Sequence, residues 1–127
     1  MPWNMSSERP IYLQLVDRIK RQIAAGKYSP GERFPSVRDL AVEAAVNPNT
    51  MQRALSALES DGLLITSRTA GRTVTTEEVL IKTMREQIAT EEYEKFYTLM
   101  KELGFDDKGI QDFIREVKIS DEKGEKS

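Results

Sequence analysis

The sequence of 127 residues contains no cysteine and no histidine. A disulfide framework is therefore excluded, as are thiolate metal sites and most zinc chemistry. A nucleophilic serine would need a lysine or a carboxylate as its base, and no serine lies in a recognisable nucleophile turn. The chain also has no glycine-rich phosphate loop. We therefore expect a protein that is not an enzyme and that needs no cofactor and no metal.

Long apolar runs are missing too, since no stretch approaches the ~20 residues of a membrane-spanning helix. The N-terminus lacks the basic-then-apolar order of a secretory signal. Hydrophobic residues still make up 39% of the chain, which is enough for one globular domain, or for a small domain with an appendage. We expect a cytoplasmic protein without a membrane partner.

Charge is unevenly distributed, although the whole chain carries only −2. Residues 1–75 carry a net charge of +3 and residues 76–127 carry −5. A basic front and an acidic back suit a protein that docks its front onto phosphates. In the acidic part, Glu91, Glu92 and Glu94 could form a hydrolytic or metal-binding cluster, but such a run is usually a solvated helix face.

The stretch from Ser36 to Gly62 has the pattern of two short amphipathic helices joined by a tight turn. Ser36 can cap the first helix, with Asp39 at the third position of a capping box. Asn47 and Pro48 can start the second helix, because asparagine accepts from exposed amides and proline needs no donor in a first turn. Gly62 can end it. This pattern predicts a helix-turn-helix.

The second of these helices has an apolar side and, on the other side, an outer stripe of polar residues. Asn49, Gln52, Arg53 and Ser56 recur in this stripe at helical spacing, and none of the four is an acid. In a DNA major groove, arginine pairs bidentately with guanine, asparagine and glutamine pair with adenine, and a threonine such as Thr50 can meet a thymine methyl. The second helix therefore has the side chains that direct base recognition needs.

The segments on either side of this unit complete a winged helix. A helix from Pro10 to Gly26 is expected to support the pair. After Gly62, two short β-favouring runs enclose Arg68, Gly71 and Arg72, which predicts a hairpin with two arginines and a glycine at its tip. These arginines are expected to neutralise phosphates or to enter the minor groove. The alternative is a plain surface hairpin.

Two further amphipathic helices are predicted in the C-terminal part, one over residues 77–103 and one after Asp106 or Asp107. Two helices of about 40 residues scarcely close a core by themselves, so their apolar faces need a partner. A second copy of the chain is the expected partner. The predicted dimerisation residues are Met84, Ile88, Phe96, Leu99, Leu103, Phe113, Ile114 and Val117.

The predicted fold is therefore mainly α with a small β-wing. It comprises a flexible lead-in (1–9), a winged helix-turn-helix DNA-binding domain (10–76), a two-helix dimerisation domain (77–119) and a disordered tail (120–127).

Three segments also carry a family resemblance: Pro-Ile-Tyr-Leu-Gln-Leu at 10–15, Pro-Gly-Glu-Arg-Phe-Pro-Ser-Val-Arg-Asp-Leu-Ala at 30–41 and Val-Asn-Pro-Asn-Thr-Met-Gln-Arg-Ala at 46–54. They resemble the N-terminal domain of GntR-family bacterial transcription regulators over residues 10 to about 75. The Asn-Pro-Asn-Thr run and the short two-helix tail resemble the YtrA subfamily in particular. The resemblance implies a dimeric operator-binding regulator, usually a repressor of a nearby transporter operon, without a large effector domain. It leaves any small-molecule effector unidentified.

The resemblance also implies DNA contacts at Arg38, Asn49, Thr50, Arg53 and Gly71. Many relatives have arginine where this chain has Gln52, a basic residue where it has Pro48, and Gly-x-Gly where it has Thr69-Ala70-Gly71. Gln52 and Arg53 are therefore expected to divide base recognition differently. Together the predicted DNA-binding residues are Arg38, Asn47, Asn49, Thr50, Gln52, Arg53, Arg68, Gly71 and Arg72.

The predicted function is sequence-specific binding of double-stranded DNA at an inverted-repeat operator. The alternative is a winged helix that contacts only other proteins. Arginines on both the second helix and the wing favour DNA.

Overall fold

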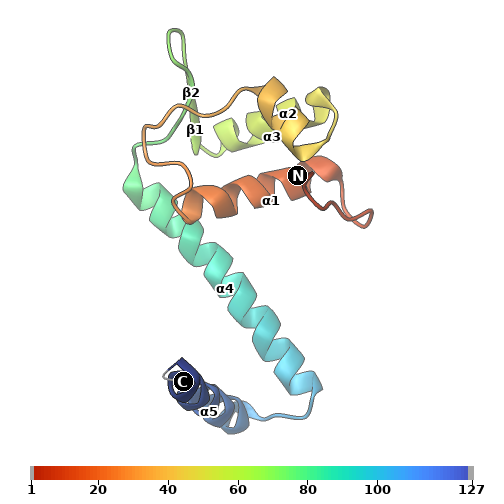
Figure 1. Cartoon of the computed structure of the whole chain (residues 1–127), viewed down its shortest axis with the longest axis vertical. Helices are drawn as coiled ribbons and strands as arrows, with labels where there is room; N and C mark the ends of the chain where they lie inside the picture. The colour runs from red at the N-terminus through yellow and green to blue at the C-terminus, as the bar shows by residue number, and fades with distance from the viewer. Residues whose placement is uncertain (1, 126–127) are drawn as a thin grey trace. The chain divides into compact units, whose positions relative to one another are not determined.

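The computed structural model describes residues 2–125 of the chain, which divide into two compact units on either side of the Glu86–Gln87 bond. Five helices and a two-stranded antiparallel sheet make up this part of the chain, so the predicted mainly α fold with a β-wing is confirmed (Figure 1). The elements are α1 (Ile11–Ala24), α2 (Val37–Ala44), α3 (Pro48–Ser60), β1 (Leu64–Ser67), β2 (Gly71–Val74), α4 (Glu78–Glu102) and α5 (Asp107–Glu125). Within residues 2–125, no helix is long and apolar enough to cross a membrane.

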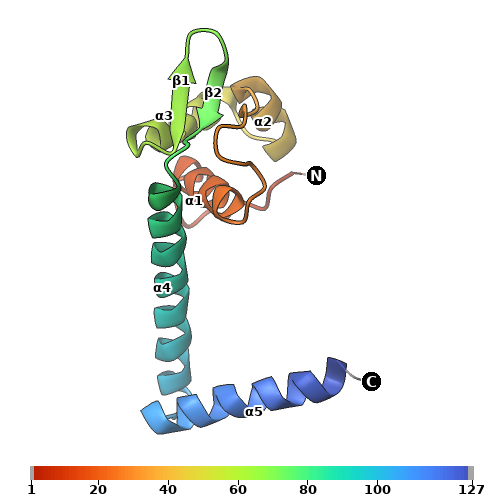
Figure 2. The same cartoon turned by 90° about the vertical axis from the view of Figure 1, so that its left-hand side faces the viewer.

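The core of the first unit lies where α1, α2 and β1 pack against α3. The amphipathic pattern of each helix is the reason, because apolar residues at helical spacing form one stripe that is buried when the helices meet. Figures 1 and 2 show the β-hairpin beside α3. The largest fully buried side chains of this core are Leu15, Ile19, Ile23, Leu40, Met51, Leu55, Leu58, Leu63, Leu64 and Val74.

The loop that leads into α2 is hydrogen-bonded to strand β2. The N–H of Gly31 donates to the carbonyl of Val74 (2.8 Å), the N–H of Val74 donates to the carbonyl of Glu32 (2.9 Å), and the N–H of Phe34 donates to the carbonyl of Arg72 (2.8 Å). These bonds continue the sheet by one irregular strand. They fix the start of α2 relative to the wing.

The N-terminal segment is packed at Trp3, so the expectation of a flexible lead-in is wrong there. The Trp3 side chain is only 6% exposed. Its indole N–H donates to Glu43 (3.2 Å), its backbone N–H donates to the carbonyl of Ala44 (3.3 Å), and the Arg18 guanidinium lies 4.9 Å from the ring centroid. A lone tryptophan without periodic neighbours gave no sequence signal for this packing.

We expect Trp3→Ala to lower the free energy of unfolding by about 2–3 kcal/mol, because the substitution removes a large buried apolar side chain and its packing contacts. Urea denaturation of the full chain measures this change. Ser7→Ala, at an exposed position of the same segment, is the control and should leave stability unchanged. Equal stability of Trp3→Ala and the parent would show that the segment contributes nothing.

The first unit extends ten residues further than the predicted boundary after Thr76. The first turns of α4 belong to it, because Ile81 is buried and the Arg85 Nε donates to the Ala24 carbonyl at the end of α1 (3.0 Å). Met84 is likewise only 6% exposed. Its predicted place at a dimer seam is therefore wrong, since its apolar surface is already covered within one chain.

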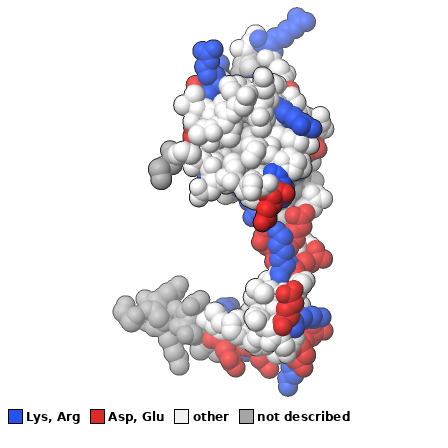
Figure 3. Space-filling view, turned by 90° about the vertical axis from the view of Figure 1, so that its right-hand side faces the viewer, with Lys and Arg blue, Asp and Glu red and all other residues white. Residues whose placement is uncertain are grey.

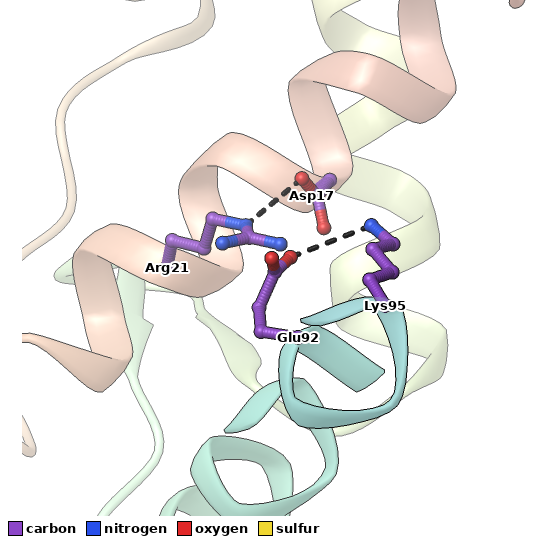
Figure 4. A network of polar contacts seen from close by, with 4 residues as sticks. All are labelled: Asp17, Arg21, Glu92 and Lys95. Carbon is purple, nitrogen blue, oxygen red and sulfur yellow. Dashed lines mark hydrogen bonds and ion pairs between the residues drawn. The ribbon is translucent and has the colours of Figure 1, made fainter. Parts of the chain in front are cut away.

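The second unit contains the rest of α4 and helix α5. Gly104, with a φ of 98°, follows the end of α4, as predicted. The Asp106 side chain caps α5 by accepting from the N–H of Gly109 (2.7 Å), which was also predicted. Met100 and Ile110 are buried. On the surface of α4, Glu92 pairs with Lys95 at 3.4 Å (Figure 4).

Much of the predicted apolar face of this unit is exposed. Leu99 and Leu103 are 54% and 65% exposed, whereas Ile88 and Phe96 are half-buried. Phe113, Ile114 and Val117 on α5 are also exposed. The predicted disordered tail from residue 120 is wrong up to Glu125, where α5 ends. Its last two residues, 126–127, lie outside the described residues.

Candidate nucleic-acid interface

Three local features shape the helix-turn-helix: a cap at the start of α2, a residue in the left-handed backbone conformation after α2, and a cap at the start of α3. The Ser36 hydroxyl accepts from the N–H of Asp39 (3.1 Å), as predicted. Ala45 then has a φ of 60°, a conformation that usually requires glycine, and this position had no sequence signal. The Asn47 side chain caps α3 by accepting from the N–H of Asn49 (2.7 Å), and Pro48 occupies the first turn. The side-chain oxygen of Asn47 is thus occupied by this hydrogen bond. Asn47 itself is exposed, and its amide nitrogen can still donate to a ligand.

Helix α3 presents the predicted polar face to the outside. Asn49, Gln52 and Arg53 are exposed, and Thr50 is half-buried. The Gln52 side chain donates to the Ser56 hydroxyl (3.1 Å), which orients the carboxamide along the helix. This leaves the Gln52 oxygen and one N–H as an acceptor–donor pair, the arrangement that adenine recognition requires.

Arg53 is stacked on Tyr12 at the start of α1, a contact that the sequence pattern did not predict. The guanidinium carbon lies 3.8 Å from the centroid of the tyrosine ring. Stacking holds the guanidinium plane while leaving its edge N–H groups free to donate, because a cation–π contact uses the face of the group. Tyr12 therefore positions Arg53, and the two helices α1 and α3 together determine where this arginine can reach.

For Arg53→Ala we expect the affinity for a selected duplex to fall by roughly 1–3 kcal/mol and the sequence preference to relax, because a lost bidentate base contact removes discrimination as well as attraction. Titration of a selected duplex and of its single-base variants measures both effects. Arg18→Ala is the matched control, since Arg18 also lies over an aromatic ring but on α1. Equal losses on every sequence would reduce Arg53 to a phosphate contact.

The wing is a short hairpin in which Thr66 pairs with Arg72 and Ser67 pairs with Gly71. Its turn is tied by the Ser67 hydroxyl, which accepts from the N–H groups of Thr69 and Ala70 at 3.3 Å each. Gly71 has a φ of 70°, so its role is conformational, and no atom lies within 4 Å of where a Cβ would be. Of the two wing arginines, only Arg68 lies in the exposed turn between the strands. The prediction of two arginines at the tip is therefore wrong for Arg72, which lies within β2.

Arg72 is paired with Glu59 on the last turn of α3. Its Nε donates to Glu59 Oε1 at 2.8 Å, and the other carboxylate oxygen accepts from the Thr66 hydroxyl on β1. The hydrogen bond from Thr66 holds the pKa of Glu59 below its ordinary value; burial opposes this, and the bond and charge of Arg72 add to it. Glu59 is thus an ionised link between α3 and both wing strands, and nothing in the helical pattern of α3 had singled it out.

The structure brings most of the predicted residues onto neighbouring elements of the first unit. The start of α2, with exposed Arg38, is held beside β2 by the Phe34–Arg72 backbone bond. On α1, Asp17 pairs with Arg21 at 3.0 Å (Figure 4), which offsets one of the basic charges there. On the face drawn in Figure 3, lysine and arginine side chains stand out separately on the first unit, whereas acidic and basic side chains lie next to one another on α4 and α5. The exposed arginines Arg38, Arg53 and Arg68 give the first unit the chemistry for phosphate contact.

Comparison with known proteins identifies the family to which this geometry belongs. Residues 11–74 match the family model described as bacterial regulatory proteins, gntR family. The chain is similar to the HTH-type transcriptional repressor YtrA of Bacillus subtilis, with 33% identity over 81% of this chain and 91% of the relative.

Two solved structures extend this similarity to three dimensions. A GntR family transcriptional regulator from Listeria monocytogenes has 33% identity and a TM-score of 0.79, over 88% of this chain and 98% of the other. The N-terminal domain of AraR, solved in complex with mutant ORR3, has 28% identity and a TM-score of 0.51, over 55% of this chain and all of the other. The capped helix-turn-helix, the wing and these similarities lead to one conclusion: the chain belongs to the GntR family of bacterial transcription regulators, which bind DNA through a helix-turn-helix.

Proposed function

We propose that the protein is a homodimeric repressor that binds an inverted-repeat operator, with α3 in the major groove and the wing on the adjacent backbone. The observation that carries the dimer is the exposed apolar face of the second unit, built on Leu99, Leu103, Phe113, Ile114 and Val117. Large apolar residues that are exposed at helical spacing on two neighbouring helices favour an interaction surface. A two-fold pair of chains would bury the same face on both copies and place two recognition helices at two half-sites.

The predicted DNA-binding residues keep their proposed roles with one change. Bases or nearby phosphates are contacted from the cap of α3 by Asn47, and from α3 itself by Asn49, Thr50, Gln52 and Arg53. The backbone contacts come from three further residues, Arg38 on α2 and Arg68 and Gly71 on the wing. The change concerns Arg72, whose charge is already paired with Glu59.

The likeness to a repressor supports the further proposal that the protein represses transcription, and the family resemblance suggests a nearby transporter operon as the target. A regulator of this kind works in the cytoplasm and catalyses no reaction. The acidic second unit would be repelled by phosphate, which would keep it away from the duplex while the first unit approaches.

Two measurements test the proposal directly. Sequences bound by the full chain are selected from a random duplex pool, and the mass of the free protein is measured by light scattering. We expect an enriched inverted repeat and twice the monomer mass. Enrichment of no sequence, together with no salt-dependent shift of any duplex, would favour a winged helix that contacts only proteins.

A further inference from the structure

The contacts of Glu59 join three elements that the proposed function uses together. Glu59 lies on the last turn of recognition helix α3. Its two oxygens accept from Thr66 on β1 and from Arg72 on β2, and these two residues face each other across the hairpin. A single carboxylate therefore fastens both wing strands to the helix that carries the base-contacting side chains.

The pairing also removes a cation from the wing. The Arg72 Nε and Glu59 Oε1 are 2.8 Å apart, and both side chains are mostly shielded from solvent, with exposures of 20% and 27%. Only charges that are delivered to phosphates release counterions from DNA. An arginine that already has a carboxylate partner at contact distance delivers little net charge to a phosphate.

We propose that Glu59 is a positioning residue that sets the DNA specificity of this protein: it holds the wing in register with α3 and withholds the charge of Arg72 from indiscriminate phosphate binding. This inference rests on the proposed function, because it requires that α3 and the wing contact duplex DNA.

The expected effect is on selectivity and not only on affinity. Binding to random duplexes comes almost entirely from phosphate contacts, whereas binding to a preferred site also needs base contacts in a fixed geometry. Releasing Arg72 adds a free cation at the wing, which strengthens binding to any sequence. Loosening the wing at the same time gives no additional base contact. The ratio of specific to random binding therefore falls.

The test uses the full chain with Glu59→Gln, which keeps the size and the acceptor oxygen of the side chain but removes its charge. Dissociation constants are measured for a selected duplex and for a random-sequence duplex of equal length at several salt concentrations. We expect random-duplex binding to tighten about 3- to 10-fold at low salt, and the slope of log affinity against log salt to steepen by about one unit, as one added phosphate contact does. Glu8→Gln removes the same charge from an exposed position of the first unit and is the control.

Arg72 decides the cause of the change. Arg72→Ala alone should leave the salt slope nearly unchanged, because the charge it removes is already neutralised, and Glu59→Gln combined with Arg72→Ala should return the slope to that of the parent protein. An unchanged slope in Glu59→Gln, or a steeper slope that persists in the double variant, overturns the proposal. If Glu59→Gln does not fold, Arg72→Ala alone is decisive, since a slope shallower by about one unit contradicts the pairing. Failure of the parent protein to bind any duplex would instead refute the proposed function, and the inference with it.

Discussion

Truncation after Glu86 should leave a folded monomer that binds an inverted-repeat duplex about 100- to 10,000-fold more weakly than the full chain. One winged helix occupies one half-site, and the second half-site adds affinity only when a second winged helix is tethered to the first. The cut falls at the boundary between the two compact units, so the core of the first unit is retained. Gel-shift titration of duplexes with one and with two half-sites measures the loss.

A cut after Thr76 is the informative comparison. It removes Ile81 and Met84, which are buried residues of the first unit, and it removes the Arg85 bond to Ala24. We expect this shorter chain to be less stable in urea than the chain ending at Glu86, since the loss of two buried apolar side chains costs several kcal/mol. Full-strength, dimeric binding by either truncated protein would refute the role given to the second unit.

A single charge in the apolar face should separate the dimer. Leu99→Asp places a carboxylate in each copy of the exposed face, and a symmetric seam then buries two uncompensated charges at a cost of several kcal/mol. We expect the dissociation constant of the dimer to rise about 1,000-fold, which corresponds to about 4 kcal/mol. Sedimentation at micromolar concentration distinguishes monomer from dimer.

Thr90→Asp is the matched control for this substitution. Thr90 is exposed on the same helix, nine residues before Leu99, which places it on the opposite side at 3.6 residues per turn. The control adds the same charge and should leave the dimer intact. Equal dissociation by both substitutions would show that general repulsion, and not burial of the face, is responsible.

Local sequence signals were sufficient for much of the first unit. The cap at Ser36, the Asn47–Pro48 start and the polar face of α3 are decided within a few residues of chain, and the structure contains all three. Apolar periodicity likewise located the helices of the second unit. It could not set the unit boundary, because whether Met84 meets its own chain or another copy depends on tertiary packing.

The contacts that the sequence did not reveal are long-range pairs. Tyr12 on α1 and Arg53 on α3 lie far apart in the sequence, and neither residue departs from an ordinary helix pattern. Glu59 and Arg72 meet only because the hairpin turns back onto α3. Charge and helical spacing identify which side chains can contact DNA, but they do not show which of those side chains are already engaged within the protein.

The hydrogen bonds between the loop at Gly31–Phe34 and strand β2 have a consequence for how the chain folds during synthesis. The ribosome makes Gly31 and Glu32 roughly forty residues before Val74, so α2 and α3 emerge while the partner of their leading loop is still missing. Closing a loop of this length costs conformational entropy before the hydrogen bonds to β2 can compensate for it. Folding is therefore slower than that of a purely local helical unit. In a nascent chain, the loop that leads into α2 can therefore form these hydrogen bonds only after strand β2 has left the ribosome.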